Sequence, residues 1–222
     1  MQPRRHARVT RDLYSFAFSL VLFCGMVLLL TLRGGGAIGD QAESSGTTSL
    51  APFYLVNLLL MVFLGLNRGA AVVRSAHPRK ALPRNALMLL LAQLLLLPYM
   101  TFLIHGTDGG VGRILLLSFY VLLTSTTWLL LGTLLALRRT SSSQSLLLNA
   151  AAVAAHLIPA LGFHFAPPGL RLLSLVSPIA AISELSSGAA IHESLVAFLF
   201  VALVAAVSAF HVVRRLRRSE DV

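Results

Sequence analysis

The side chains that could do chemistry are few, and their positions limit what that chemistry could be. Three histidines and three carboxylates fall at the ends of apolar runs, at one expected depth: His105, His164, His192, Asp108, Glu184 and Glu193. Imidazole and carboxylate groups are ligands that zinc and copper accept. No two of these histidines have the spacing of a metal motif, and solvated histidines explain them more simply. We expect no metal site, but the sequence leaves a metal at His105, His164 and His192 open.

The motifs of soluble enzymes are absent. The chain has no G-x-x-x-x-G-K-[ST], G-x-S-x-G or H-E-x-x-H sequence, so it lacks a P-loop, a nucleophile elbow and a zinc-protease helix. His156 is the one ionisable side chain in the middle of an apolar run. A neutral histidine bonded to a carbonyl or hydroxyl group of a neighbouring helix is the simpler interpretation. A haem site would need a second histidine facing His156 at the same depth, and none is apparent. We therefore expect no catalytic residues, no cofactor and no enzymatic activity.

The composition is that of a polytopic membrane protein. Of the 222 residues, 56% are hydrophobic and 12% are charged, about half the charged fraction of a soluble domain. A soluble domain of this size cannot hide so much apolar surface from water. The single cysteine, Cys24, excludes an intrachain disulfide.

Six apolar runs are long enough to cross a bilayer, whose hydrocarbon core needs roughly 20 helical residues. They cover residues 14–32, 52–73, 86–104, 114–137, 146–165 and 194–213. The first run is too long for a typical signal peptide and is expected to stay in the protein. The sequence predicts an all-α protein with a single transmembrane domain over residues 1–222, six transmembrane helices and no separate soluble domain.

Basic residues alternate with these runs. Fifteen of the 18 lie in the N-terminal tail, in the loops after the second and fourth runs and in the C-terminal tail; the other three are Arg33, Arg113 and Arg171. Basic flanks stay on the cytoplasmic side of a membrane, so both termini are predicted to be cytoplasmic. The net charge of +10 then reflects topology, and we expect no nucleic-acid partner.

Prolines, glycines and hydroxyl residues inside the runs predict packing features. Pro98 and Pro159 should kink their helices. Glycines allow two helices to approach closely, which is the expected role of Gly65, Gly132 and Gly162. The hydroxyl groups of the fourth run can bond across helices; they belong to Ser118, Thr124, Ser125, Thr126 and Thr127.

The segment between the fifth and sixth runs is apolar but interrupted. Pro167, Pro168 and Gly169 end the fifth run, and residues 170–191 are broken again at Ser177-Pro178. Each piece is too short to span a bilayer. Two short helices that dip into the membrane from the outer side satisfy this pattern, with Leu173, Ser177, Pro178 and Ile179 at their junction. An ordinary amphipathic outer loop is the alternative.

The cytoplasmic loop after the second run combines apolar, small and basic residues. A short interfacial helix is predicted within residues 67–80, ended by Pro78 and Pro83. The residues expected to dock on a soluble partner are Arg68, Gly69, Val72, Val73, Arg74 and Pro78. The alternative is a basic topology anchor that contacts anionic lipid.

Taken together, these features resemble the type-2 ABC transporter permeases. Gly69 and Pro78 hold two positions of that family's pattern after span two, although Asn67-Arg68 stands where the family has an acidic residue and Ala70 where it has threonine. The stretch from Leu173 to Ala181, which contains Ser177-Pro178, looks like the family's leucine-rich outer segment.

The resemblance implies a membrane-spanning subunit of an ABC exporter in the cytoplasmic, or inner, membrane of a bacterium. Such a subunit pairs with a second permease, as a homo- or heterodimer, and moves a substrate with ATP hydrolysed by a separate subunit. The coupling loop would be residues 67–80, and residues 170–191 would form the re-entrant outer segment. Two alternatives remain open: a structural or assembly membrane protein, and a membrane-embedded metal or haem binder.

Overall fold

The protein is a bundle of long helices. The computed structural model describes residues 50–106, 110–137, 154, 177–187 and 191–218. Its helices are α2 (Ala51–Val73), α3 (Pro78–Leu94), α4 (Leu97–Gly106), α5 (Gly110–Ala136), α8 (Pro178–Ser187) and α9 (Ile191–Arg218). No strand occurs among these residues.

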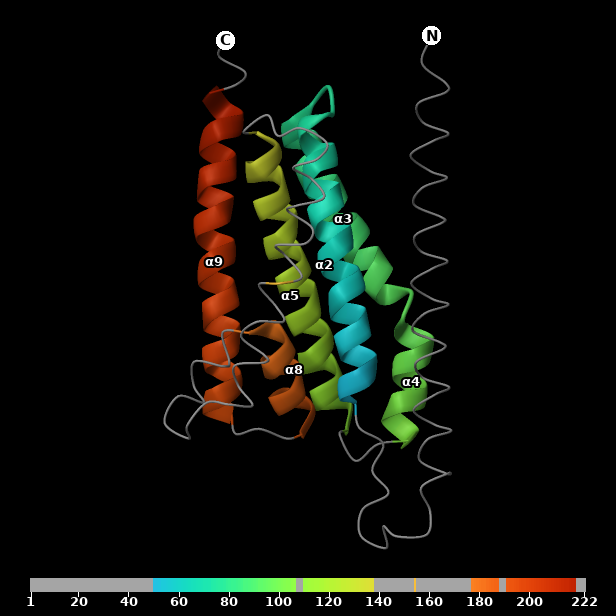
Figure 1. The fold of residues 1–222 in the computed structure, drawn as a ribbon. Helices are drawn as coiled ribbons and strands as arrows, with labels where there is room; N and C mark the ends of the chain where they lie inside the picture. Colours follow the sequence, from blue (N-terminus) through green and yellow to red (C-terminus); the bar gives the residue numbers. More distant parts are fainter. Residues whose placement is uncertain (1–49, 107–109, 138–153, 155–176, 188–190, 219–222) are drawn as a thin grey trace, which may run out of the picture.

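The three longest helices run in the same direction. α2, α5 and α9 all begin at the lower end of the bundle in Figure 1 and end at the upper end. α3 and α4, which follow α2 and precede α5 in the sequence, carry the chain back down. Every lysine and arginine of the described residues except Arg113 lies toward the upper end. We call this the basic end and the other the opposite end.

These three helices are long and apolar enough to cross a membrane: Ala51–Val73, Gly110–Ala136 and Leu195–Arg217. They correspond to the second, fourth and sixth predicted runs, and their boundaries lie within a few residues of those expected. The chain is thus an all-α, multi-pass membrane protein. The first and fifth predicted runs, residues 14–32 and 146–165, lie outside the described residues except for residue 154.

The third run, predicted as one span over residues 86–104, is instead two helices. α3 ends at Leu94 and α4 begins at Leu97. Pro98 explains the break, because its ring clashes with the carbonyl of Leu94 and it has no N–H to donate there. The chain tightens before it, where the Leu96 N–H donates to the Gln93 carbonyl at 3.1 Å. The expected kink at Pro98 is therefore confirmed, in the stronger form of a helix break.

α2 and α5 make the most extensive contact of any two described helices. Glycines bring their backbones together: a Cβ on Gly65 would meet the Ser125 carbonyl oxygen, and one on Gly132 would lie 2.5 Å from the Leu66 carbonyl oxygen. Gly65 and Gly69 form the G-x-x-x-G spacing that suits such close crossings. The packing roles predicted for Gly65 and Gly132 are confirmed, whereas Gly162 lies outside the described residues.

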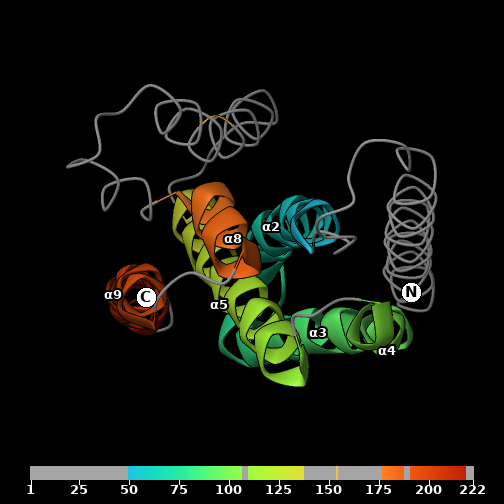
Figure 2. The ribbon, with the colours of Figure 1, turned by 90° about the horizontal axis from the view of Figure 1, so that it is seen from below.

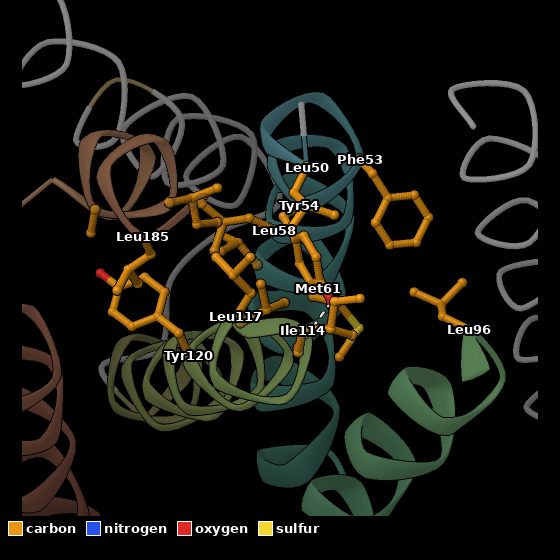
Figure 3. Packing of buried hydrophobic residues seen from close by; sticks show 14 of the residues in the cluster. Leu50, Phe53, Tyr54, Leu58, Met61, Leu96, Ile114, Leu117, Tyr120 and Leu185 are labelled. Atoms are coloured by element: carbon orange, nitrogen blue, oxygen red, sulfur yellow. Dashed lines mark hydrogen bonds between the residues drawn. The ribbon is translucent and has the colours of Figure 1, made fainter. Parts of the chain in front are cut away.

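A core of large side chains fills the space on either side of this contact. Figure 3 shows Leu58 and Met61 of α2 facing Leu117 of α5, with Leu185 of α8 beside Tyr120. α8 lies at the opposite end of the bundle, against α2, α5 and α9 (Figure 2). α9 lies at the edge of the described bundle and packs mainly on α5.

Candidate functional site

A small apolar cluster joins three helices at the basic end. Leu82 of α3 and Leu130 of α5 pack with Val212 and Leu216 of α9. This contact brings together two basic segments that lie more than 120 residues apart in the sequence, the α2–α3 turn and the end of α9. The basic end is thus one surface supported by α3, α5 and α9.

The α2–α3 connection differs from the separate helix predicted for residues 67–80. α2 continues without interruption to Val73, and a turn over residues 74–77 leads into α3. Gly69 and Val72 keep the chain helical, because both are buried on the face of α2 that carries Gly65. The expectation of a separate interfacial helix is wrong.

Pro78 begins a helix instead of ending one. It stands at the first position of α3, where the missing N–H has no intrahelical partner to lose. Pro83 then lies inside α3, and the helix continues through it within its first two turns.

The residues predicted to dock on a partner divide into buried and exposed groups. Val72 is 0% exposed, and a Cβ on Gly69 would lie 2.6 Å from the Thr133 nitrogen, so both belong to the contact with α5. Arg68, Val73 and Pro78 are half-buried, whereas Arg74 is exposed. A soluble partner at this end would therefore meet the turn and the start of α3: Arg74, Ala76, His77, Arg79, Lys80 and Arg84, all of which are exposed.

The start of α3 is strongly electropositive. It has no acidic residue in its first turn, so the positive end of the helix dipole adds to the charges of Arg79 and Lys80. Hydrogen bonds hold the turn at both ends, and at its start the Ser75 N–H donates to the Val72 carbonyl at 3.1 Å. The His77 N–H donates to the Ser75 hydroxyl at 3.3 Å, and the Ala81 N–H donates to the His77 carbonyl at 3.0 Å. A short, ordered, cationic turn suits contact with an acidic surface.

At the opposite end, α8 begins where the sequence predicted a break. Ser177 is buried and its carbonyl accepts the first helical hydrogen bond, from Ala181, at 2.9 Å. Pro178 and Ile179 follow and are half-buried in the first turn of α8. The Arg113 guanidinium of α5 donates to the Ser186 carbonyl near the end of α8, at 3.5 Å. Leu173 and the first half of the predicted outer segment lie outside the described residues.

A polar network ties α2 to α5 and α4 near this end. The Tyr54 hydroxyl donates to the Ile114 carbonyl and lies 3.0 Å from the Ser118 hydroxyl. The Ser118 oxygen in turn lies 3.5 Å from the Met100 sulfur. Ser118 thus reaches a neighbouring helix, as predicted. Within the described residues, Ser125, Thr126 and Thr127 instead donate to carbonyls of their own helix.

A buried amide pair links α2 to α3 and was not predicted from the sequence. The Asn57 side-chain N–H of α2 donates to the Gln93 side-chain oxygen of α3 at 3.2 Å, and both residues are buried. Among the described residues, no hydrogen-bond partner is found for the other two polar atoms of the pair, Asn57 Oδ1 and Gln93 Nε2. The prediction considered ionisable side chains in the apolar runs and not uncharged amides. Asn57 and Gln93 within apolar runs were the signal that could have identified this pair.

The described residues contain no group of three or more His, Cys, Asp or Glu that could hold a metal ion. His105 lies in α4 and His192 in the first turn of α9, whereas His156 and His164 lie outside the residues that the structure describes.

Comparison with protein-family models, with curated proteins and with solved structures finds no match for this chain.

Proposed function

We propose that the chain is the membrane-spanning permease subunit of an ABC exporter, which moves its substrate with ATP hydrolysed by a separate subunit. The main support for this proposal is the α2–α3 turn. A subunit with no P-loop of its own needs a mechanical contact with a subunit that binds ATP. The α2–α3 turn is suited to such a contact because it is exposed, ordered and cationic.

The helices on either side of the turn are built differently, which supports a coupling role. α2 is held on α5 by the glycine contacts of Gly65 and Gly69. α3 contacts α2 far less extensively and is broken from α4 after Leu94. Force applied to the turn would therefore move α3 as a lever about the break, while the α2–α5 pair stays fixed.

The direction of the helices is also consistent with this proposal. α2, α5 and α9 run parallel, as the second, fourth and sixth helices of a six-span permease must. α8 supplies a short helix after Ser177-Pro178 at the end away from the turn, where the resemblance places the re-entrant segment. In this proposal the basic end faces the cytoplasm of a bacterium, and a second permease completes the transporter.

The test is purification of the tagged full-length chain from its native membranes in mild detergent. We expect a chain with a P-loop to co-purify in stoichiometric amount and the preparation to hydrolyse ATP. Arg74→Glu with Lys80→Glu should lower the amount of bound ATPase at least tenfold, because it reverses both charges at the contact. Val72 is unsuitable for this test, because its side chain is fully buried.

The matched control is Arg214→Glu with Arg217→Glu, which makes the same change in charge at the same end of the bundle but on α9. This variant should keep the ATPase. Equal losses from the two variants would mean that net charge, not the turn, holds the partner. If the wild-type chain never co-purifies with an ATPase, the exporter proposal is wrong and a structural or assembly role becomes the better account.

A further inference from the structure

α9 carries a continuous apolar face that none of the other described helices covers. Leu199, Leu203 and Phe210 are 67%, 64% and 63% exposed, and their spacing of four and seven residues places them on one side of the helix. Only 22% of the most apolar stretch of α9 is buried, against 50% for α2 and for α5. This side of α9 thus contacts none of the other described helices.

Two arginines continue the same face at the basic end. Arg214 and Arg217 follow Phe210 by four and seven residues, and both are exposed. We call Leu199, Leu203, Phe210, Arg214 and Arg217 the outer face of α9. It is an apolar stripe of about 16 Å between Leu199 and Phe210, at 1.5 Å per residue, with positive charge at one end only.

The opposite side of α9 fixes the direction in which this face points. Val201, Ser208, Val212 and Leu216 are buried, and the last two pack against Leu82 of α3 and Leu130 of α5. Rotation of α9 would break this contact, so the outer face cannot turn inward without exposing the buried side.

The arrangement matches the chemistry of an anionic phospholipid. An apolar stripe of this length corresponds to about half of a 30 Å hydrocarbon core, the reach of one leaflet's acyl chains. Arginine pairs with phosphate through two parallel N–H donors, and basic residues next to a membrane helix attract anionic lipid. A second copy of the chain fits less well, because parallel pairing of two outer faces would bring their arginines together.

We propose that the outer face of α9 binds an anionic phospholipid of the leaflet at the basic end, with the acyl chains along Leu199, Leu203 and Phe210 and the phosphate on Arg214 and Arg217. The site would keep this lipid bound when the protein is extracted from the bilayer, and it would prefer an anionic headgroup. The proposal does not depend on an ATPase partner.

Native mass spectrometry of the full-length chain in detergent tests this, with phosphatidylglycerol and phosphatidylcholine as probes. We expect phosphatidylglycerol to bind at a defined stoichiometry and more tightly than phosphatidylcholine. Arg214→Gln with Arg217→Gln should weaken phosphatidylglycerol binding about thirtyfold, given the typical contribution of each basic residue at an anionic surface. Equal binding of the two lipids by the wild type would overturn the proposal.

Arg74→Gln with Lys80→Gln is the matched control, since it removes the same charge at the same end. Arg74 follows the last residue of α2, whereas Lys80 lies on the same face of α3 as the exposed Leu87 and Leu91. The control therefore also compares α9 with a second exposed apolar stripe that has basic residues at this end. This control should weaken binding less than threefold. An equal loss from both variants would show a net-charge effect and contradict a site on α9.

A second measurement keeps the test independent of the arginine variants. Trp128 is the only tryptophan, so Phe210→Trp in a Trp128→Phe chain reports on the outer face alone. Its fluorescence should be quenched more by phosphatidylglycerol with brominated tails than by brominated phosphatidylcholine. Equal quenching would mean that the face meets bulk lipid without preference, which contradicts the proposal.

Discussion

At the scale of single residues, three glycines set the distance between α2 and α5. Gly65 and Gly69 of α2 and Gly132 of α5 each lie against backbone atoms of the other helix. The Thr133 hydroxyl marks how close the helices come, because it lies 3.3 Å from the Gly69 carbonyl oxygen and 2.8 Å from the Leu129 carbonyl oxygen of its own helix. No flexible side chain separates the two backbones, so nothing at these positions can yield to a larger residue.

Gly65→Ala is therefore expected to destabilise the protein although alanine favours helices. The new Cβ would meet the Ser125 carbonyl oxygen, and overpacking of this kind costs about 1–3 kcal/mol or more. Thermal unfolding in detergent, followed by size-exclusion chromatography, measures it. Gly112→Ala is the control, because its Cβ would meet nothing within 4 Å; it should leave the unfolding temperature unchanged or raise it. Equal effects of the two variants would contradict the role of close packing.

Residue types predicted some of these roles and misled on others. Glycines in apolar runs pointed to close helix contacts, and Gly65 and Gly132 make them. Gly69 is assigned to the coupling loop because it matches a glycine of the permease pattern, yet its position four residues after Gly65 is the better guide. Val72 is assigned to docking because it is apolar and flanked by small and basic residues. Its position three residues after Gly69 places it on the same face of α2, and it is fully buried there.

At the scale of elements, the break between α3 and α4 is the main departure from regular spans. Pro98 removes one donor and crowds the Leu94 carbonyl, and the intervening Leu96 is fully buried. In the proposed function, this break is where α3 moves relative to α4.

Pro98→Ala should extend helical hydrogen bonding across the break, because it restores the N–H that a continuous helix needs at that position. Hydrogen–deuterium exchange of peptides covering residues 91–103 should become slower. The reference is Pro83→Ala, which changes a proline in the first two turns of α3 and should leave exchange over residues 91–103 as it is. Unchanged exchange in Pro98→Ala would show that packing around Leu96, not the proline, causes the break.

Periodicity and run length predicted α2, α5 and α9 within a few residues, because each is one uninterrupted apolar stretch. The third run shows the limit of that method, since run length alone cannot tell a continuous helix from a broken one. Pro98 gave the position of the break but not its size. Pro78 was ambiguous for a related reason: proline ends a helix that precedes it and begins one that follows it, and the choice depends on the apolar residues after it.

At the scale of the whole molecule, the structure gathers the basic residues of distant segments at one end. The α2–α3 turn and the end of α9 are joined there by the cluster of Leu82, Leu130, Val212 and Leu216. The alternation of charge along the sequence predicted a common side for these segments. Which helices touch was not predictable, because it depends on the complementary glycine and side-chain surfaces of α2, α5 and α9.

The proposed function requires that this end face the cytoplasm and the opposite end face outward. Two probes in a Cys24→Ser chain test this most directly: His77→Cys in the exposed turn, and Gly112→Cys in open space at the start of α5. A membrane-impermeant maleimide added to intact cells should label Gly112→Cys, and it should label His77→Cys only after the membrane is opened. Labelling of His77→Cys in intact cells, or of both probes from one side, would contradict the account.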